Sequence, residues 1–363
     1  MTIRLFASPL AYLQGPGALD RLGGVAAAVG QDALAVVDGP VLALLGERIG
    51  RTLAGAGLAF RLLPFEGKVT AAAVARLAAA AGEGVDVVLA IGGGSAVDAG
   101  KAVAARLGSP VVTVPTAASN DAPTSRIFVL YDEGGAIVSV ERMAQNPAAV
   151  VVDTGVLLTA PPRLLVSGIG DALSKKAEAE GCAAVDGLTP LGTPPLTLPR
   201  TIAALAFRTL LEDAAAAVDD ARARRLTPAF ERTVEAVILM SGLGFEAGGL
   251  SLAHSMTRGF TRLPACAAAM HGEQVAFALL VQLAATPGGE EDLSRLLPLY
   301  RRIGLPVTLE ALGLSSTDFD ALGTIVEATF GAPHIGHLPF ALDEGGLLAA
   351  ILAVDAMGLH GGS

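Results

Sequence analysis

The sequence is poor in cysteine, aromatic residues and charge, and these shortages exclude several kinds of site. Only two of its 363 residues are cysteines, Cys182 and Cys266. They lack the C-x-x-C spacing of thiolate metal sites and suggest no disulfide framework, so we expect small buried residues. Aromatic residues make up 4%, and there is no tryptophan. Charged residues make up 17% with a net charge of -10, and no stripe of lysine or arginine indicates a nucleic-acid surface.

Long apolar runs and a leader segment are also missing. No run reaches the roughly 18 residues that would span a bilayer. Residues 1–14 have neither an apolar core nor a small-residue cleavage site. The remaining composition, 52% hydrophobic with 44 glycines, is typical of globular proteins with large buried faces. We therefore expect a cytoplasmic protein of two domains that acts on neither nucleic acid nor membrane.

The most informative stretch is a strand, a glycine turn and a helix. The apolar run 85–91 stops at Gly92, Gly93 and Gly94, and Ser95 leads into a helical pattern over 96–107. This geometry presents free backbone N–H groups and a positive helix end to a phosphate. Glycine lets the backbone approach that phosphate without a Cβ in the way. An ordinary tight connection is the alternative, because the turn alone is a weak signal.

Strand and helix patterns alternate around this turn. Strands are predicted at 12–14, 33–39, 59–65, 111–116 and 149–153, and helices at 18–29, 41–56 and 71–81, the last capped by Thr70. The alternation predicts a doubly wound parallel sheet, in which ligands bind at the carboxyl ends of the strands. Asp38, Gly92 and Thr116 all fall at such ends.

Helical patterns dominate from residue 163 onward. They cover 168–181, 199–218, 228–257, 272–284 and 290–303, and Pro161-Pro162 looks like the linker before them. We therefore predict an α/β domain over residues 1–160 and an all-α domain over 161–363.

Three residues of the helical half form a possible metal-ligand set. Asp171 is at a predicted helix start, His254 lies near the end of a long predicted helix, and His271 follows a loop. One aspartate and two histidines often bind a catalytic divalent metal. The spacing is not a compact motif, and aspartate is also a good helix cap, so both interpretations stay open. For His334 and His337 we expect exposed or hydrogen-bonded side chains.

Two features of the first half are candidates for cofactor or substrate contacts. Asp38 ends a strand, where an acid can accept both hydroxyls of an adenosine ribose and repel a 2′-phosphate, favouring NAD over NADP. A turn aspartate before Gly39 is equally compatible with the spacing. The loop 119–125 is dense in small polar groups and can either line a site or simply form turns.

Together these motifs resemble the glycerol dehydrogenases, a polyol-oxidising branch of the iron-containing alcohol dehydrogenase superfamily whose fold is shared with dehydroquinate synthase. The resemblance rests on residues 92–98, 114–123, 146–147, 168–173, 241–249, 254 and 271–273, in the same order along nearly the whole chain. It implies an N-terminal nucleotide domain, a C-terminal helical domain and a cleft between them. It also implies a small alcohol substrate and a homo-oligomer.

The resemblance further implies the role of individual residues. It makes Asp171, His254 and His271 the metal ligands, and Asp121 a residue that meets the substrate hydroxyls. Phe245 would lie near the nicotinamide. The NAD-binding residues that it implies are Asp38, Gly92, Gly93, Gly94, Ser95, Asp98, Thr116, Ser119, Ser125, Val129 and Tyr131.

Lys175 departs from the pattern of many iron-dependent relatives, which carry a histidine one helical turn after the ligand aspartate. The site is left with three protein ligands, which suits catalytic Zn²⁺ better than iron. Lys175 shares a helix face with Asp171, so its ammonium could attract a carboxylate or phosphate. Relatives acting on phosphorylated glycerol or 2-hydroxy acids often have lysine there. A lysine that points to solvent is the alternative.

We therefore predict a metal-dependent oxidoreductase that transfers hydride from a polyol hydroxyl to NAD, with Asp121 and Lys175 as catalytic residues. One alternative is the same chemistry on a 2-hydroxy acid or glycerol phosphate. Another is a lyase of the dehydroquinate synthase type, against which the Asn120-Asp121 loop and an aspartate at the metal position count. A catalytically silent nucleotide-binding protein is the third.

Overall fold

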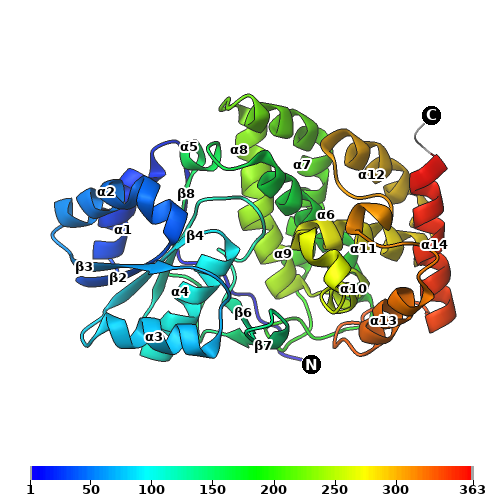
Figure 1. The fold of residues 1–363 in the computed structure, drawn as a ribbon, viewed down its shortest axis with the longest axis horizontal. Helices are drawn as coiled ribbons and strands as arrows, with labels where there is room; N and C mark the ends of the chain where they lie inside the picture. Colours follow the sequence, from blue (N-terminus) through cyan, green and yellow to red (C-terminus); the bar gives the residue numbers. More distant parts are fainter. Residues whose placement is uncertain (1, 361–363) are drawn as a thin grey trace. The chain divides into compact units, whose positions relative to one another are not determined.

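The computed structural model describes residues 2–360, and the chain divides into two compact units (Figure 1). The first, which we call the α/β unit, comprises Ser8–Leu164 with Arg224–Leu226. The second, the helical unit, comprises Met1–Ala7, Leu165–Ala223 and Thr227–Ser363. The glycine turn therefore belongs to the α/β unit, whereas Asp171 and both candidate histidines belong to the helical unit.

A six-stranded parallel sheet forms the α/β unit and confirms the predicted doubly wound class. The strands, in the spatial order β1-β8-β5-β4-β2-β3, are β1 (Tyr12–Gly15), β8 (Ala149–Asp153), β5 (Val111–Pro115), β4 (Val87–Gly92), β2 (Asp32–Asp38) and β3 (Ala59–Phe65). In the register, Val37 pairs with Ile91, and Gly92 pairs with Pro115. The ends of β2, β4 and β5 therefore lie together at one edge of the sheet, as the sequence predicted.

Helices cover both faces of this sheet (Figure 1). They are α1 (Leu22–Ala27) after a 3-10 turn at Ala18–Arg21, α2 (Gly39–Gly55), α3 (Ala71–Ala81), α4 (Gly94–Leu107) and the short α5 (Thr154–Leu157). The limits of α3 match the prediction, and the hydroxyl of Thr70 caps it by accepting a hydrogen bond from the Ala73 N–H at 3.1 Å.

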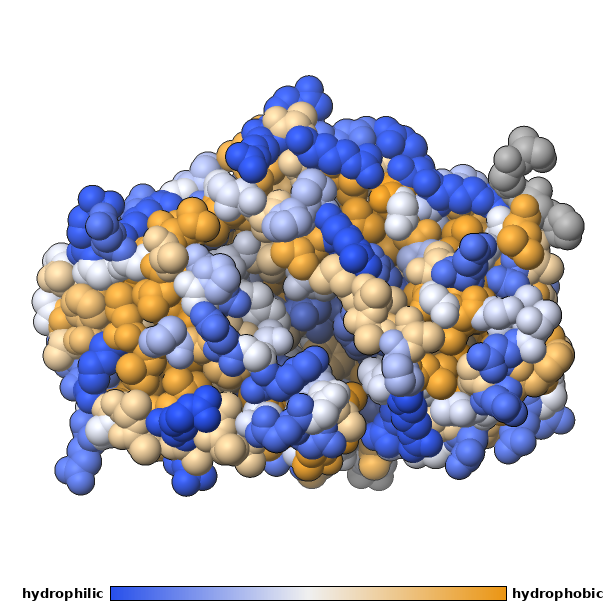
Figure 2. Space-filling model, viewed as in Figure 1, coloured by the Kyte–Doolittle hydropathy of each residue, from blue (hydrophilic) through white to orange (hydrophobic). Residues whose placement is uncertain are grey.

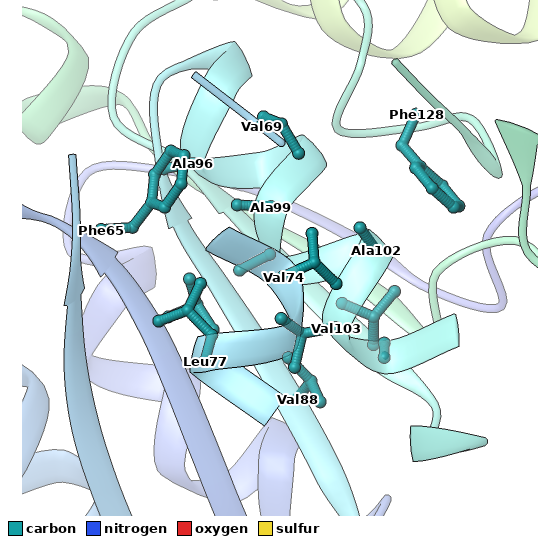
Figure 3. Close-up of a cluster of buried hydrophobic side chains, with 14 of the residues drawn as sticks. Phe65, Val69, Val74, Leu77, Val88, Ala96, Ala99, Ala102, Val103 and Phe128 are labelled. Atoms are coloured by element: carbon teal, nitrogen blue, oxygen red, sulfur yellow. The ribbon is translucent and has the colours of Figure 1, made fainter. Parts of the chain in front are cut away.

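The apolar cluster between the sheet and α3 and α4 sets the position of the glycine turn. In Figure 3, Val74 and Leu77 of α3 and Ala99 and Val103 of α4 point into one cluster. Small residues bring α4 unusually close to β4, because a Cβ on Gly100 would lie 2.3 Å from the Cβ of Ala90. This contact holds the start of α4 against the end of β4.

The hairpin formed by β6 (Ile127–Tyr131) and β7 (Ile137–Arg142) is missing from the sequence prediction. Five of the six residues of β7 are exposed, so the strand shows no alternation of buried and exposed side chains. The hairpin carries Val129 and Tyr131, two of the expected cofactor contacts.

The helical unit consists of nine main helices within the described residues. They are α6 (Pro162–Ala184), α7 (Thr197–Arg222), α8 (Pro228–Glu235), α9 (Ser241–Gly248), α10 (Leu252–Phe260), α11 (His271–Ala285), α12 (Glu290–Ile303), α13 (Phe319–Phe330) and α14 (Glu344–His360), with a π-helical turn at Ala236–Met240 and 3-10 turns at Pro264–Ala268 and Glu310–Leu312. Cys182 and Cys266 are both buried and free, as expected.

Three sequence predictions for the region from α6 to α10 are wrong. Pro162 begins α6 instead of forming a linker, and α6 runs for 23 residues, so Asp171 lies in its middle and cannot be its cap. The helix predicted over 228–257 is broken after α9, where Gly249 adopts a φ of 99° that favours glycine. His254 is consequently in the first turn of α10 and not at the end of a helix.

Hydrophobic residues (orange) lie among hydrophilic ones (blue) over each unit on the face shown in Figure 2. Within the part of the chain that is described, no single helix is long and apolar enough to cross a membrane. The bent pair Pro228–Gly248 and Leu252–Phe260 meets the criterion by length and composition only, with a bend of 101°.

The close packing of α4 on β4 gives a stability prediction. Gly100→Ala should lower the free energy of unfolding by about 1–3 kcal/mol, because the new methyl group overlaps Ala90. Gly55→Ala is the matched control, since a Cβ there meets no described atom within 4 Å. It should leave stability unchanged or raise it by up to about 1 kcal/mol. Denaturant unfolding measures both, and equal effects of the two substitutions would contradict this packing.

Candidate functional site

The glycine turn leaves the start of α4 open to a ligand. The N-cap Gly93 makes no side-chain capping bond, and a Cβ built on it meets no described atom within 4 Å. On Gly94 a Cβ would lie 2.4 Å from the amide nitrogen of Asn120, so the 119–125 loop approaches the turn closely. Uncapped N–H groups at the positive end of a 14-residue helix form a suitable cradle for a phosphate.

Asp98 and Lys101 connect α4 to the segments around this cradle. Asp98 Oδ2 accepts a hydrogen bond from the Val129 N–H at 3.1 Å. The ammonium of Lys101 is fully buried and donates to the carbonyls of Ala122 and Ile127, the second at 2.8 Å. The loop that contains Asp121 is therefore tied to the helix that begins at the glycine turn.

One oxygen of this arrangement is a free acceptor. Asp98 Oδ1 is buried and has no hydrogen-bond partner among the described residues. An orphaned buried acceptor beside an open glycine cradle fits a bound ligand that supplies donors, as the hydroxyl-rich and amide-bearing NAD would.

Other predicted cofactor residues lie close to the turn. The Thr116 N–H donates to the Gly92 carbonyl at 3.0 Å. Asp38 caps α2, since its Oδ1 accepts from the Val41 N–H at 3.4 Å, and its Cβ would lie 2.7 Å from a Cβ on Gly92. Asp38 is thus a capping residue as well as a neighbour of the turn. Ser95 is exposed in the first turn of α4.

The remaining predicted residues occupy the 119–131 segment. Ser125 is buried, with its hydroxyl 3.5 Å from the Lys101 ammonium. Asp121 is 8% exposed, and its carbonyl accepts from the Thr124 N–H. Tyr131 pairs with Val69 through its N–H, and burial raises the pKa of its phenol. Ser119 begins this loop three residues after Thr116.

In the helical unit, the structure brings together all three predicted metal-binding residues. Asp171 of α6, His254 of α10 and His271 of α11 each offer one ligand atom, and these atoms lie within 4.8 Å of one another. Asp171 Oδ1 is 3.3 Å from His254 Nε2 and 3.9 Å from His271 Nε2. Asp171 is 1% exposed, whereas the side chain of His271 is 49% exposed, so the cluster is accessible from one side.

Glycine contacts between α6 and α11 allow Asp171 and His271 to lie close together. A Cβ on Gly272 would lie 1.8 Å from the Ser167 carbonyl oxygen, and one on Gly170 would lie 2.5 Å from the Gly272 carbonyl oxygen. The two backbones therefore touch beside the cluster. Because Asp171 follows Gly170 and His271 precedes Gly272, the glycines bring both side chains to the same point.

Glu178 fixes the orientation of His254. It is fully buried, with Oε2 2.6 Å from His254 Nδ1, and its other oxygen accepts from the His254 N–H at 3.0 Å. Burial alone would raise the pKa of Glu178, but His254 holds it at about 2. Burial alone would likewise lower the pKa of His254, but the Glu178 carboxylate raises it to about 9. A carboxylate on one imidazole nitrogen directs the other nitrogen toward a metal, as in many metal sites.

Sequence reasoning missed Glu178, although a signal for it was present. It follows Asp171 by seven residues, which places both on one face of a helix.

Lys175 faces the cluster, so the interpretation that it points to solvent is wrong. It is 1% exposed, and its Nζ lies 2.7 Å from Asp171 Oδ1 and 3.2 Å from His254 Nε2. The ring of Phe245 lies 5.5 Å from the same nitrogen. Burial would raise the pKa of Asp171, but Lys175 and the two histidines hold it below its usual range.

Lys176, His334 and His337, which the sequence also singled out, are not members of the three-residue cluster. The side chain of Lys176 is 25% exposed and pairs with Asp292 and, at 3.6 Å, with Glu180. His337 Nδ1 lies 2.6 Å from the Leu250 carbonyl oxygen, as expected of a hydrogen-bonded histidine, and its ring is 5.7 Å from that of His334.

Comparison with known proteins agrees with this geometry. Residues 13–161 match the family described as iron-containing alcohol dehydrogenase. A glycerol dehydrogenase of Pseudomonas putida is 36% identical over 359 residues, with 98% of each chain covered. The solved glycerol dehydrogenase of Schizosaccharomyces pombe has a TM-score of 0.94 at 32% identity, covering 99% of this chain and 92% of that one. A probable glycerol dehydrogenase from Sinorhizobium meliloti has a TM-score of 0.91 at 35% identity, covering 99% of both.

The orphaned oxygen of Asp98 gives a pH prediction. Burial raises the pKa of Asp98 from 3.8 to about 6, against the smaller opposing effect of Lys101. Between these values the folded protein binds more protons than the unfolded chain, so stability falls as pH rises.

Asp98→Asn should remove this decline while keeping an acceptor for the Val129 N–H. Relative to the parent, the variant should gain up to about 3 kcal/mol of unfolding free energy between about pH 4 and pH 6. Urea unfolding of both proteins across this range measures the gain. If the difference in unfolding free energy between the two proteins does not change with pH, burial does not raise the pKa of Asp98.

Proposed function

Because the chain belongs to the iron-containing alcohol dehydrogenase family, we propose that it is an NAD-dependent polyol dehydrogenase whose substrate is glycerol or a close analogue. The observation that carries the proposal is the convergence of Asp171, His254 and His271 on one point. The glycerol dehydrogenases to which the chain is similar over 98% or more of its length support the substrate class.

The donor set of the cluster fits a divalent metal. One carboxylate and two imidazoles leave coordination positions free for a substrate. The orientation of His254 by Glu178, and an accessible side at His271, are what such a centre requires. Zinc is favoured over iron, because lysine stands where a fourth ligand would be expected. When bound, the metal acts as a Lewis acid that lowers the pKa of the substrate hydroxyl.

Residues of the helical unit supply charge and orientation for this chemistry. Asp171 provides the negative charge that balances a cation in a buried position. Glu178 accepts the Nδ1 proton of His254, which leaves the Nε2 lone pair directed at the cluster. The ammonium of Lys175 is a donor close to both ligands and can reach a substrate oxygen there.

Residues of the α/β unit hold the cofactor in this proposal. The open start of α4 takes the pyrophosphate, and Asp38 accepts the hydroxyls of the adenosine ribose. The remaining predicted positions, from Asp98 to Tyr131, bind the rest of NAD. Asp121, in the loop that Lys101 ties to α4, orients the substrate hydroxyls.

The alternatives are less well supported. Against an anionic substrate, relatives matched over 98% of this chain include glycerol dehydrogenases, whose named substrate carries no charge. A lyase of the dehydroquinate synthase type leaves no net NADH, which distinguishes it in a simple absorbance assay. A silent nucleotide-binding protein would not need three ligand atoms within 4.8 Å.

The metal-binding role of His254 gives the first functional prediction. The zinc-loaded parent should form NADH from glycerol, and His254→Ala should lose both zinc and turnover while still binding NAD. Loss of a group that hydrogen-bonds to a metal ligand lowers metal affinity roughly 10–100-fold, so loss of the ligand itself should lower it at least as much. His337→Ala is the control, because His337 bonds only to the Leu250 carbonyl among the contacts described above. Full zinc content and a near-normal rate in His254→Ala would remove it from the site.

The preference for NAD over NADP gives the second functional prediction. The parent should have a higher kcat/KM with NAD than with NADP. Asp38→Asn should reduce the ratio of these two values, because it removes the charge that repels a 2′-phosphate. Asparagine is chosen since it can still cap α2 through the Val41 N–H. Values of kcat/KM for both cofactors test this, and equal values in the parent would rule out the role of Asp38.

A further inference from the structure

The ammonium of Lys175 uses the atoms that the candidate metal centre would use. Its Nζ lies 2.7 Å from Asp171 Oδ1 and 3.2 Å from His254 Nε2. These two atoms belong to two of the three residues of the cluster, and they are 3.3 Å apart. A divalent metal would approach the same two atoms to about 2.0–2.2 Å.

The contact between Glu178 and His254 identifies the ring nitrogen involved. Glu178 Oε2 lies 2.6 Å from His254 Nδ1, so Nε2 is the nitrogen left to bind a metal. The Nζ atom of Lys175 lies 3.2 Å from that Nε2. Lys175 therefore occupies the side of His254 that a metal ion needs.

Burial makes this contact different from a surface ion pair. The side chains of Lys175 and Asp171 are 1% and 2% exposed, so neither charge is solvated by bulk water. The pair between Lys176 and Glu180, also four residues apart in α6, has side chains 25% and 48% exposed and a separation of 3.6 Å. Water screens the charges of Lys176 and Glu180. The charges of Lys175 and Asp171 are out of reach of bulk water, so each must be balanced by its protein partners.

We propose that Lys175 is an internal cation that competes with the divalent metal for Asp171 and His254. This inference rests on the proposed function, since it concerns the same centre. The ammonium compensates the buried carboxylate when no metal is bound, and a metal that binds must displace it from at least one of the two ligand atoms. Metal binding is consequently weaker and more easily reversed than the three ligands alone would allow.

Phe245 offers the ammonium of Lys175 a second partner when a metal displaces it. The ring of Phe245 is 5.5 Å from Nζ, and the face of an aromatic ring attracts a cation. The four-carbon stem of lysine is flexible, so the head group can change partners without moving α6. Competition therefore requires only a side-chain rearrangement.

Zinc affinity of the full chain tests the proposal. The parent, Lys175→Met and Lys175→Arg are stripped of metal and titrated with Zn²⁺ against a chelator of known affinity. Lys175→Met, which removes the charge and keeps much of the volume, should bind Zn²⁺ roughly 10–100-fold more tightly, the range found for changes beside metal ligands. Lys175→Arg keeps the charge and should bind no more tightly than the parent. Lys176→Met is the matched control and should bind like the parent.

Thermal unfolding without metal provides an independent readout. Stripped Lys175→Met should melt several degrees below the stripped parent, because Asp171 has lost its nearest cation. Added Zn²⁺ should raise its Tm more than it raises that of the parent. If Lys175→Met does not fold when stripped, Lys175→Gln, which keeps a donor without the charge, takes its place in both measurements.

The outcomes separate this inference from the function on which it rests. If the uncharged variant binds zinc no more tightly than the parent does, the competition is overturned and the proposed function is left intact. Zinc binding by none of the folded proteins would overturn both. An unchanged melting temperature of the stripped uncharged variants would exclude Lys175 as the compensating charge.

Discussion

The buried carboxylate of Asp171 is the constraint on which the helical unit depends. An ionised carboxylate in the middle of a helix and 1% exposed is costly unless charges and donors surround it. Three nitrogen-bearing side chains from three helices do so, namely Lys175, His254 and His271. The glycine contact between α6 and α11 and the break before α10 both serve to bring those nitrogens to it.

The α/β unit contains a similar pair of a buried aspartate and a buried lysine, but its aspartate has its pKa shifted in the opposite direction. Asp98 and Lys101 lie three residues apart on α4, much as Asp171 and Lys175 lie four apart on α6. The ammonium of Lys101 donates to backbone carbonyls, whereas that of Lys175 contacts the carboxylate directly. Burial therefore raises the pKa of Asp98 to about 6, while the pKa of Asp171 is held low. The first pair organises a loop, and the second is suited to holding a cation.

Much of the fold could be predicted because local signals agreed with the tertiary structure. The limits of α3, its Thr70 cap and the apolar runs of the parallel strands follow from hydrophobic pattern and capping chemistry. The ends of β2, β4 and β5 could be placed together because parallel strands share one edge. The convergence of Asp171, His254 and His271 could be expected only through the resemblance, since residues from three helices share no local spacing.

The errors have physical causes. Proline at Pro162 was interpreted as a linker although proline is favoured in the first turn of a helix. The break at Gly249 was missed because the glycines around it are flanked by helical patterns on both sides. The strand β7 lacks a buried face, so period-two alternation could not reveal it. The direction of Lys175 could not be predicted from its helix face alone, because that face is buried through contacts with His254 of α10 and His271 of α11, which are distant in the sequence.

The central claim is that Asp171, His254 and His271 together bind one divalent metal. Anomalous diffraction at the zinc absorption edge from crystals of the zinc-loaded protein tests it most directly. The account predicts one strong zinc peak about 2.0–2.2 Å from an Asp171 carboxylate oxygen and from Nε2 of both histidines. A zinc peak elsewhere in the chain, with Asp171 contacted only by Lys175, would contradict it.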